Sequence, residues 1–278
     1  MIGVIGGSGL YKMKGLKNVE EKEIATPFGE PSAPVAVGTL EGKKIAFLAR
    51  HGKNHSHSPS TLNYRANIYA LKKIGVDRII AAAAVGSLKE ELKPGEIVIP
   101  DQTFDKTSRK NSFFDEGIVA HVSIADPFCK ELSGIMHKSA GEEKVKAYLG
   151  GTYVCMEGPQ FSTRAESEFH RKMGFDVIGM TGATEAKLAR EAEICYTSLA
   201  TVTDYDVWRE SDVTVDMILG TLKKNTENVE KIIKNALGKI PEKRTCTCKD
   251  ALANAIVTQN IAPAVKEKMG LLIGRYVK

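Results

Sequence analysis

The sequence predicts a single α/β domain with a central mixed, twisted β-sheet flanked by helices. Short apolar segments alternate with longer amphipathic segments over most of the chain, and neither an internal repeat nor a low-complexity linker interrupts them. With 278 residues, of which 42% are hydrophobic, the chain can bury one large core. We expect residues 1–240 to form this domain. Residues 241–278, a Cys-x-Cys segment and a helical tail, should pack on it.

The strands and helices are predicted from apolar periodicity and from the glycine and proline residues that bound most strands. The predicted strands are residues 1–5, 35–37, 45–49, 78–85, 97–99, 154–156, 177–180 and 196–202. The predicted helices are residues 63–74, 163–173, 185–192 and 215–237. The second helix begins with the hydroxyl cap Thr163, and Glu166 stands three residues later, at capping-box spacing. In such folds the chemistry collects in loops at the carboxyl ends of strands.

Charge and hydropathy narrow the class of protein. No apolar run reaches the roughly 20 residues of a membrane helix, and the start lacks the pattern of a signal peptide, so we expect a cytoplasmic protein. The net charge of +5 suits an anionic ligand. The lysines are spread over helices and the tail without interleaved aromatic residues, which disfavours nucleic acid as a partner. We expect a small-molecule enzyme with neither membrane nor nucleic-acid partners.

Two segments predict a bound phosphate. The sequence GGSG at residues 6–9 follows the first strand, where glycine lets backbone N–H groups face an anion and Ser8 adds a hydroxyl. Residues 50–60 follow another strand and hold two cations, three histidines and three serines. Neither a dinucleotide fingerprint nor a P-loop fits this spacing. The histidines make a poor zinc site, because Pro59 and the serines indicate a loop and no carboxylate flanks the rings.

Asp204 and Asp206 form an acidic pair after the last predicted strand. A solvated turn or a helix cap is the ordinary explanation, but Tyr205 and Trp208 indicate a segment that packs. In a pocket, one carboxyl can accept from an exocyclic amine while the other, with its pKa raised by burial, donates to a ring nitrogen. The pair therefore predicts a purine site. No G-x-S-x-G elbow supports covalent hydrolysis.

The five cysteines divide into two groups. Cys129, Cys155 and Cys195 lie in apolar segments and should be buried and reduced. Cys246 and Cys248 are too close for a relaxed disulfide, and they lack the partner pair of a zinc ribbon. A strained, redox-active bridge therefore remains open beside the reduced state.

Ten short motifs follow one another along the chain: GGSGL at 6–10, TPFG at 26–29, ARHG at 49–52, NYRAN at 63–67, GSL at 86–88, PG at 94–95, EGPQF at 157–161, GMT at 179–181, EAKLA at 185–189 and TDYDVW at 203–208. In these motifs and in their order the chain resembles the 5′-methylthioadenosine phosphorylase branch of the trimeric purine nucleoside phosphorylase family. The resemblance implies the purine nucleoside phosphorylase fold and a homotrimer, or a hexamer formed as a dimer of trimers. It implies phosphorolysis of methylthioadenosine in purine and methionine salvage, with inorganic phosphate as co-substrate and without a metal or an organic cofactor.

The resemblance also assigns roles to individual residues. Those implied to bind phosphate are Ser8, Arg50, His51, Ala83, Ala84 and Thr181. Those implied to bind the nucleoside are Phe161, Met180, Asp204, Asp206, Val215, Ile218, Leu219 and His121. Of the latter, His121 is implied to reach the substrate of a neighbouring subunit. The implied catalytic residues are Asp204, Asp206 and His51.

Two departures from the family pattern leave alternatives open. A threonine usual before Gly-Ser-Leu is replaced in the alanine run 81–84, which removes a hydroxyl contact to phosphate. Ala183-Thr184 stands where the family has a valine or methionine followed by proline, and this loop borders the base. A 5′-methylthioinosine phosphorylase or a broad-specificity phosphorylase is therefore the alternative. The predicted anion site disfavours a nucleoside-binding regulator without turnover. The Cys-x-Cys tail resembles that of archaeal, heat-stable members.

Overall fold

The computed structural model describes residues 1–7, 13, 15–209 and 215–277. Its centre is one mixed sheet with strand order β2-β3-β4-β1-β5-β10-β9-β7, from which β11, β6 and β8 branch at β5. The strands are β1 Ile2–Gly6, β2 Lys17–Lys22, β3 Val35–Leu40, β4 Lys43–Ala49, β5 Arg78–Ser87, β6 Ile97–Ile99, β7 Gln102–Asp105, β8 Ala147–Leu149, β9 Thr152–Cys155, β10 Val177–Gly179 and β11 Cys195–Asp204. The predicted α/β fold with a mixed central sheet is confirmed.

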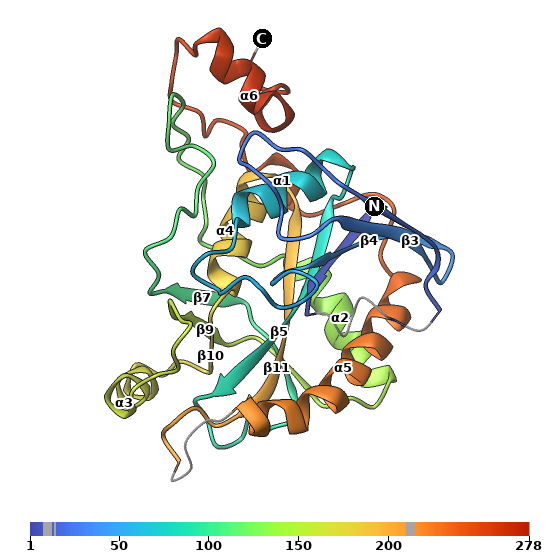
Figure 1. Ribbon diagram of the computed structural model, residues 1–278, viewed down its shortest axis with the longest axis vertical. Helices are drawn as coiled ribbons and strands as arrows, with labels where there is room; N and C mark the ends of the chain where they lie inside the picture. The colour runs from blue at the N-terminus through green and yellow to red at the C-terminus, as the bar shows by residue number, and fades with distance from the viewer. Residues whose placement is uncertain (8–12, 14, 210–214, 278) are drawn as a thin grey trace.

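Helices cover both faces of the sheet (Figure 1). They are α1 Tyr64–Lys73, α2 Lys130–Glu142, α3 Arg164–Lys172, α4 Gly182–Glu191, α5 Val215–Leu237 and α6 Pro263–Ile273, with a 3₁₀ turn η2 at Thr247–Asp250. Apolar side chains of α1 and α4 join one buried cluster, and those of α2 and α5 join a second. In β1, Val4 belongs to the second cluster and Ile5 to the first, since side chains alternate across a strand.

The predicted strands and helices are all present; β6 and α5 have the predicted bounds and the others have shifted ends. Helix α4 begins at Gly182, three residues before the predicted start, and the capping box joins Thr163 to Glu166 as predicted. The strands β2, β7 and β8 and helix α2 were missed. β2 and β7 are sheet-edge strands whose side chains are exposed or half-buried, so they carry no apolar alternation.

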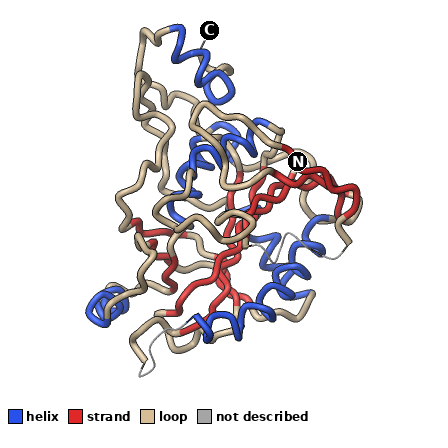
Figure 2. Tube along the Cα trace, viewed as in Figure 1, coloured by secondary structure: helices blue, strands red, loops and turns tan. Residues whose placement is uncertain are grey.

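The C-terminal segment packs onto the sheet's first cluster. Its buried side chains there are Leu252, Ala255, Ile261, Met269, Leu272 and Ile273. Figure 2 shows that long loops connect this segment to the strands and helices at the centre. The boundary between residues 1–240 and 241–278 stays a prediction. Within the described residues, none of the helices is long and apolar enough to cross a membrane.

The strained bridge between Cys246 and Cys248 is absent, because all five cysteines are free thiols. The reason lies in the direction of the two side chains. Cys246 places its sulfur 3.3 Å from that of Cys195, on β11. Cys248 places its sulfur 3.4 Å from a guanidinium nitrogen of Arg190.

Candidate active site

A break in the pairing of strand β5 opens the middle of the sheet. On one edge of β5, β1 pairs with residues 78–81 and β10 with residues 86 and 87, while β11 runs along the other edge. Between these partners Ala83 is half-buried and Ala84 is exposed, although β5 is a central strand. The opening along residues 82–85 is therefore the candidate active site.

Arg50 lies at one end of this opening in a buried ion pair. Its Nε and Nη2 donate to the two carboxylate oxygens of Glu185 at 2.5 and 3.0 Å, and its Nη1 donates to the carbonyl oxygen of Ala82 at 2.8 Å. Burial opposes the charge, but the Glu185 carboxylate outweighs burial and raises the pKa of Arg50. These bonds use three of the five guanidinium N–H groups, so two can donate to a bound anion.

The start of helix α4 adjoins this ion pair. The Tyr196 hydroxyl donates to Glu185 at 2.8 Å, which fixes the carboxylate from a third side. Thr181 is the buried N-cap of α4, and its side chain makes no capping hydrogen bond. A free hydroxyl and the first N–H groups of a helix form a favourable place for an anion. Ser8, the other predicted hydroxyl, lies outside the described residues.

His51 follows Arg50 and is neutral in this environment. Burial, with the nearby charge of Arg50, lowers the pKa of His51 to about 4. Its Nδ1 lies 2.9 Å from the carbonyl oxygen of His57, so Nδ1 carries the proton and Nε2 is an acceptor. His51 stacks on His55 in the predicted loop, with ring centroids 4.5 Å apart. In this tautomer the ring can accept a hydrogen bond from a protonated phosphate oxygen.

Asp204 and Asp206 lie at the other end of the opening, and both are buried. Asp204 Oδ2 accepts from the Thr203 hydroxyl at 2.7 Å, and its Oδ1 accepts from the backbone N–H of Asp206 at 2.8 Å. Asp206 Oδ2 is buried without a hydrogen-bond partner. Burial raises the pKa of both carboxyls. This pair can accept from a ligand amine and can hold a proton for a ring nitrogen.

The segment that carries the acids packs tightly, as Tyr205 and Trp208 predicted. The Trp208 indole N–H donates to the carbonyl oxygen of Ser87 at 2.7 Å, and the Arg171 guanidinium lies 3.8 Å from the Trp208 ring centroid. A Cβ added at Gly86 would lie 2.9 Å from Asp204 Oδ1. Glycine at this position therefore lets the carboxylate approach β5.

The two ends of the opening are connected by β5 itself. Arg50 contacts the carbonyl of Ala82, and Asp204 lies against Gly86, four residues further along the strand. At about 3.3 Å per residue, these two β5 positions are about 13 Å apart. The exposed Ala84 lies between them. The site thus places the cation and the acids at opposite ends of one stretch of β5, of which Ala83 and Ala84 in the middle are accessible.

The other residues predicted to bind the nucleoside differ in how far they are exposed. Met180 is half-buried beside Gly158, where an added Cβ would lie 2.5 Å from the Met180 sulfur. Phe161 is 42% exposed on the loop between β9 and α3. Ile218 is half-buried and Leu219 is exposed in the first turns of α5.

Two further predicted residues are not brought into the site by the described structure. The side chain of Val215 lies outside the described part of the chain. His121 is exposed, and its backbone N–H donates to the carbonyl oxygen of Ala255 at 2.9 Å, in the C-terminal segment. The described contacts do not join His121 to the acids or to Arg50.

Arg109 shapes the site although no sequence pattern singles it out. Its Nε donates to Glu157 Oε1 at 2.8 Å, and its Nη1 donates to the Tyr64 hydroxyl at 2.8 Å and to the carbonyl oxygen of Met180 at 2.5 Å. One guanidinium thereby ties the loops after β9 and β10 to the start of α1. Arg109 lies in a polar stretch without periodicity, so the sequence does not identify it as a site residue. Its partner Glu157 was identified only as part of the EGPQF motif.

Known proteins share both this fold and this arrangement along the chain. A model of the phosphorylase superfamily matches residues 1–238. The S-methyl-5′-thioadenosine phosphorylase of Koribacter versatilis is 55% identical over 280 residues, which span 99% of this chain and 96% of the relative. That of Pyrococcus furiosus is 51% identical over 257 residues, covering 92% and 99% of the two chains.

Solved structures of known proteins have the same fold as this chain. A methylthioadenosine phosphorylase sourced from an antarctic soil metagenomic library superposes with a TM-score of 0.93 at 46% identity, covering 98% of each chain. The Schistosoma mansoni methylthioadenosine phosphorylase in complex with tubercidin superposes with a TM-score of 0.82 at 36% identity, covering 90% of this chain and 95% of the other. The fold and the matched residues place the chain in the phosphorylase superfamily. Within that superfamily it belongs to the S-methyl-5′-thioadenosine phosphorylases, which confirms the resemblance found in the sequence.

Proposed function

We propose that this protein cleaves 5′-methylthioadenosine with inorganic phosphate to adenine and 5-methylthioribose 1-phosphate. The C1′–N9 bond breaks, a phosphate oxygen forms the new bond to C1′ from the opposite face, and adenine leaves with a proton at N7. One observation carries this proposal: the buried acids Asp204 and Asp206, with raised pKa values, lie along β5 from the cation Arg50. A reaction between a purine nucleoside and phosphate needs acids at the base and a cation at the phosphate.

The acids act on the base. One carboxyl of the pair accepts from the exocyclic amine of adenine, and Asp204 and Asp206 together hold the proton that N7 takes up as the bond breaks. Phe161 and Met180 pack on the purine and ribose. A 6-oxo purine presents an acceptor where these acids also accept, so the amine is preferred.

Phosphate is bound by the cationic end. Arg50 supplies two N–H groups, Thr181 and Ser8 supply hydroxyls, Ala83 and Ala84 supply backbone, and His51 accepts from a phosphate hydroxyl through Nε2. Because Arg50 is fixed by Glu185 before phosphate arrives, little of its side-chain freedom remains to be lost on binding.

The 5′ substituent is assigned to the start of helix α5. The side chain of Asn225 donates to the carbonyl oxygen of Val202 at 3.0 Å, which holds α5 against the end of β11. Val215, Ile218 and Leu219 are apolar and stand at the start of this helix. Exchange of methylthio for hydroxyl there should cost about 10–200-fold in kcat/KM.

We propose a homotrimer, or a hexamer formed as a dimer of trimers, on the basis of the family. The exposure of His121 supports its assignment to the 5′ group of a neighbouring subunit's substrate. Sedimentation velocity of the purified protein measures the assembly. A monomer that turns over at the full rate contradicts the role of His121.

The proposed reaction is tested with the purified protein and a substrate panel in the presence and absence of phosphate. Chromatography measures the free base, and ³¹P NMR detects the sugar 1-phosphate. We expect turnover only with phosphate, and faster turnover of methylthioadenosine than of adenosine or methylthioinosine. Release of adenine at the same rate without phosphate would exclude phosphorolysis. Faster cleavage of methylthioinosine would instead support the alternative base specificity.

The role of Asp204 is tested by Asp204→Asn. An amide offers a donor to O6 of a 6-oxo purine, so the variant should lose activity on methylthioadenosine and recover relative activity on methylthioinosine. An unchanged ratio of kcat/KM between the two substrates would remove Asp204 from base recognition.

A further inference from the structure

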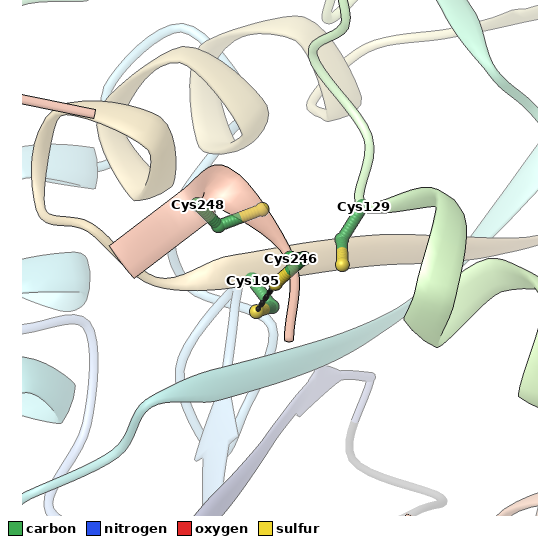
Figure 3. Close-up of side chains that lie close together, drawn as sticks. All are labelled: Cys129, Cys195, Cys246 and Cys248. Carbon is green, nitrogen blue, oxygen red and sulfur yellow. Dashed lines mark hydrogen bonds between the residues drawn. The ribbon is translucent and has the colours of Figure 1, made fainter. Parts of the chain in front are cut away.

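Four of the five cysteines converge near the start of strand β11, at the opposite end of that strand from Asp204. Cys129 precedes helix α2, Cys195 begins strand β11, and Cys246 and Cys248 flank the start of the 3₁₀ turn η2. Their four sulfur atoms all lie within 4.8 Å of one another. Figure 3 shows the side chains arriving from these three segments at one common space.

The backbones that carry these cysteines are held independently of the sulfurs. The N–H of Cys129 donates to the carbonyl oxygen of Tyr196 at 2.8 Å, and the N–H of Cys195 donates to that of Asp77 at 3.1 Å. Glu131, in the first turn of α2, accepts from the N–H of Cys246 at 3.1 Å. The neighbouring Thr245 hydroxyl donates to the same oxygen at 2.5 Å. The cluster is therefore built into the fold and does not depend on a chance approach of flexible side chains.

The charge around the cluster suits thiolate ligands. The Arg190 guanidinium lies 3.4 Å from the Cys248 sulfur and offsets negative charge there. Cys129 stands at the N-terminus of the 13-residue helix α2, where the helix dipole stabilises an anion. Three of the four cysteines are buried and Cys246 is half-buried, so the site is closed except at one sulfur.

We propose that Cys129, Cys195, Cys246 and Cys248 bind one Zn²⁺ as a tetrahedral, four-thiolate structural site. With Zn–S bonds of about 2.3 Å, tetrahedral sulfurs lie about 3.8 Å apart, within about 1 Å of the separations found in the cluster. On binding, the four thiols release four protons and the site carries a net charge of −2, which Arg190 partly neutralises. Four soft thiolates and no open position select zinc over oxygen-preferring cations.

The site would join the C-terminal segment to the sheet. Cys246 and Cys248 lie in residues 241–278, whereas Cys129 and Cys195 belong to α2 and β11, so one ion connects three segments remote in sequence. Its role is structural, since none of the described contacts joins the four cysteines to Arg50, Asp204 or Asp206. Binding to the folded state alone raises stability by mass action.

The test uses the full-length protein, reduced with a phosphine and dialysed against equimolar zinc. Mass spectrometry of the metals should give one zinc per chain, and cobalt in its place should give thiolate-to-metal charge-transfer absorption. Cys246→Ser removes the half-buried ligand and should abolish stoichiometric zinc. Cys155→Ser is the matched control, because Cys155 is the buried cysteine outside the cluster and its loss should leave zinc bound. Chelation should lower the Tm of the unsubstituted protein and of C155S alike.

Several results would overturn the site. These are substoichiometric zinc in reduced and folded protein, iron in place of zinc, equal loss of zinc in C155S and C246S, or reformation of disulfides among these four thiols under the reducing conditions. If C246S does not fold, as seen by loss of its circular dichroism signal, the Tm of the unsubstituted protein before and after chelation is the deciding measurement. A lower Tm after zinc removal supports the site, and an unchanged Tm on complete zinc removal contradicts it.

Discussion

The two ends of the candidate site treat a buried carboxylate in opposite ways. At the anion end, both oxygens of Glu185 accept from Arg50, and one accepts also from Tyr196. At the base end, Asp206 Oδ2 is also buried but has no hydrogen-bond partner. A fully paired carboxylate positions a neighbour, whereas an unpaired one costs free energy that only a ligand can recover. Glu185 therefore holds Arg50 in position, whereas Asp206 is placed to contact the substrate.

Helix α4 provides a third carboxylate with an intermediate environment. Glu191, in its last turn, accepts from the Ser112 hydroxyl at 2.7 Å and from the N–H of Phe113 at 2.6 Å, without an opposite charge. Burial raises the pKa of Glu191 to about 7. Neutral donors therefore do not suffice to keep the half-buried Glu191 carboxylate fully ionised, whereas the guanidinium beside Glu185 supplies an opposite charge.

The largest effect is expected when the paired end is broken. Arg50→Ala leaves Glu185 buried without its cation, which should cost about 3–5 kcal/mol of unfolding free energy, besides raising the KM for phosphate. Urea unfolding measures the first effect and phosphate titration of the initial rate measures the second. Unfolding free energy unchanged in the variant would show that the ion pair is not what holds this end together.

Removing both charges is the matched control. In the double variant Arg50→Met with Glu185→Gln, no uncompensated charge is buried, so part of the stability should return while phosphate binding stays impaired. Equal instability of the single and double variants would mean that Arg50 acts through packing rather than through charge.

Asp206, at the base end, should respond in the opposite way. Asp206→Asn keeps the shape of the side chain and removes the charge of a buried carboxylate whose Oδ2 has no hydrogen-bond partner, so the Tm should stay within a few degrees of that of the unsubstituted protein or rise. Loss of the group that accepts from the base should lower kcat by about 10²-fold. A fall in Tm comparable with that of Arg50→Ala, measured by scanning calorimetry, would contradict the contrast between the two ends.

A smaller effect is expected from Glu191→Gln, through pH. Because the folded state raises the pKa of Glu191 to about 7, it keeps a proton that the unfolded chain releases near its ordinary pKa. Stability from this group is therefore full at low pH and is lost as pH rises through about 5 to 7, by about 1–2 kcal/mol after allowance for partial exposure. Denaturant titrations measure the unfolding free energy at pH 5 and pH 8, and its change between the two pH values should be smaller in Glu191→Gln than in the unsubstituted protein. An identical change in both proteins would exclude the raised pKa.

Much of the fold could be predicted because the central strands are continuous apolar runs. β6 was predicted at its observed bounds and β1, β4, β5 and β11 within a few residues, since buried strands carry their signal in composition. Edge strands such as β2 carry charged side chains, so a sequence pattern gives no reason to expect them. The sequence predicted the acids and Arg50 as site residues because they stand at or just beyond the carboxyl end of a strand.

What the sequence could not supply is the pairing between distant segments. Glu185 lies 135 residues from Arg50, and Arg109 lies 71 residues from Met180, so no local spacing relates them. The Cys-x-Cys pair lacked a partner pair in sequence for the same reason: Cys129 and Cys195 reach it only through the fold. Long-range polar partners are fixed by topology rather than by periodicity.

The smallest effect is expected at the capping box of helix α3, whose first residue, Arg164, donates to the carbonyl oxygen of Val207 at 3.0 Å, next to the acids of the base end. The Thr163 hydroxyl accepts from the N–H of Glu166 at 3.2 Å, and Glu166 Oε2 accepts from the N–H of Thr163 at 2.8 Å. Thr163→Ala should cost about 1 kcal/mol of unfolding free energy, and Thr163→Ser should restore most of it. Because α3 follows the loop of Phe161, KM for the nucleoside should rise while KM for phosphate stays unchanged. Initial rates with each substrate varied in turn measure both constants. A rise confined to the phosphate KM would show that the two ends are coupled through α3, against the separation inferred above.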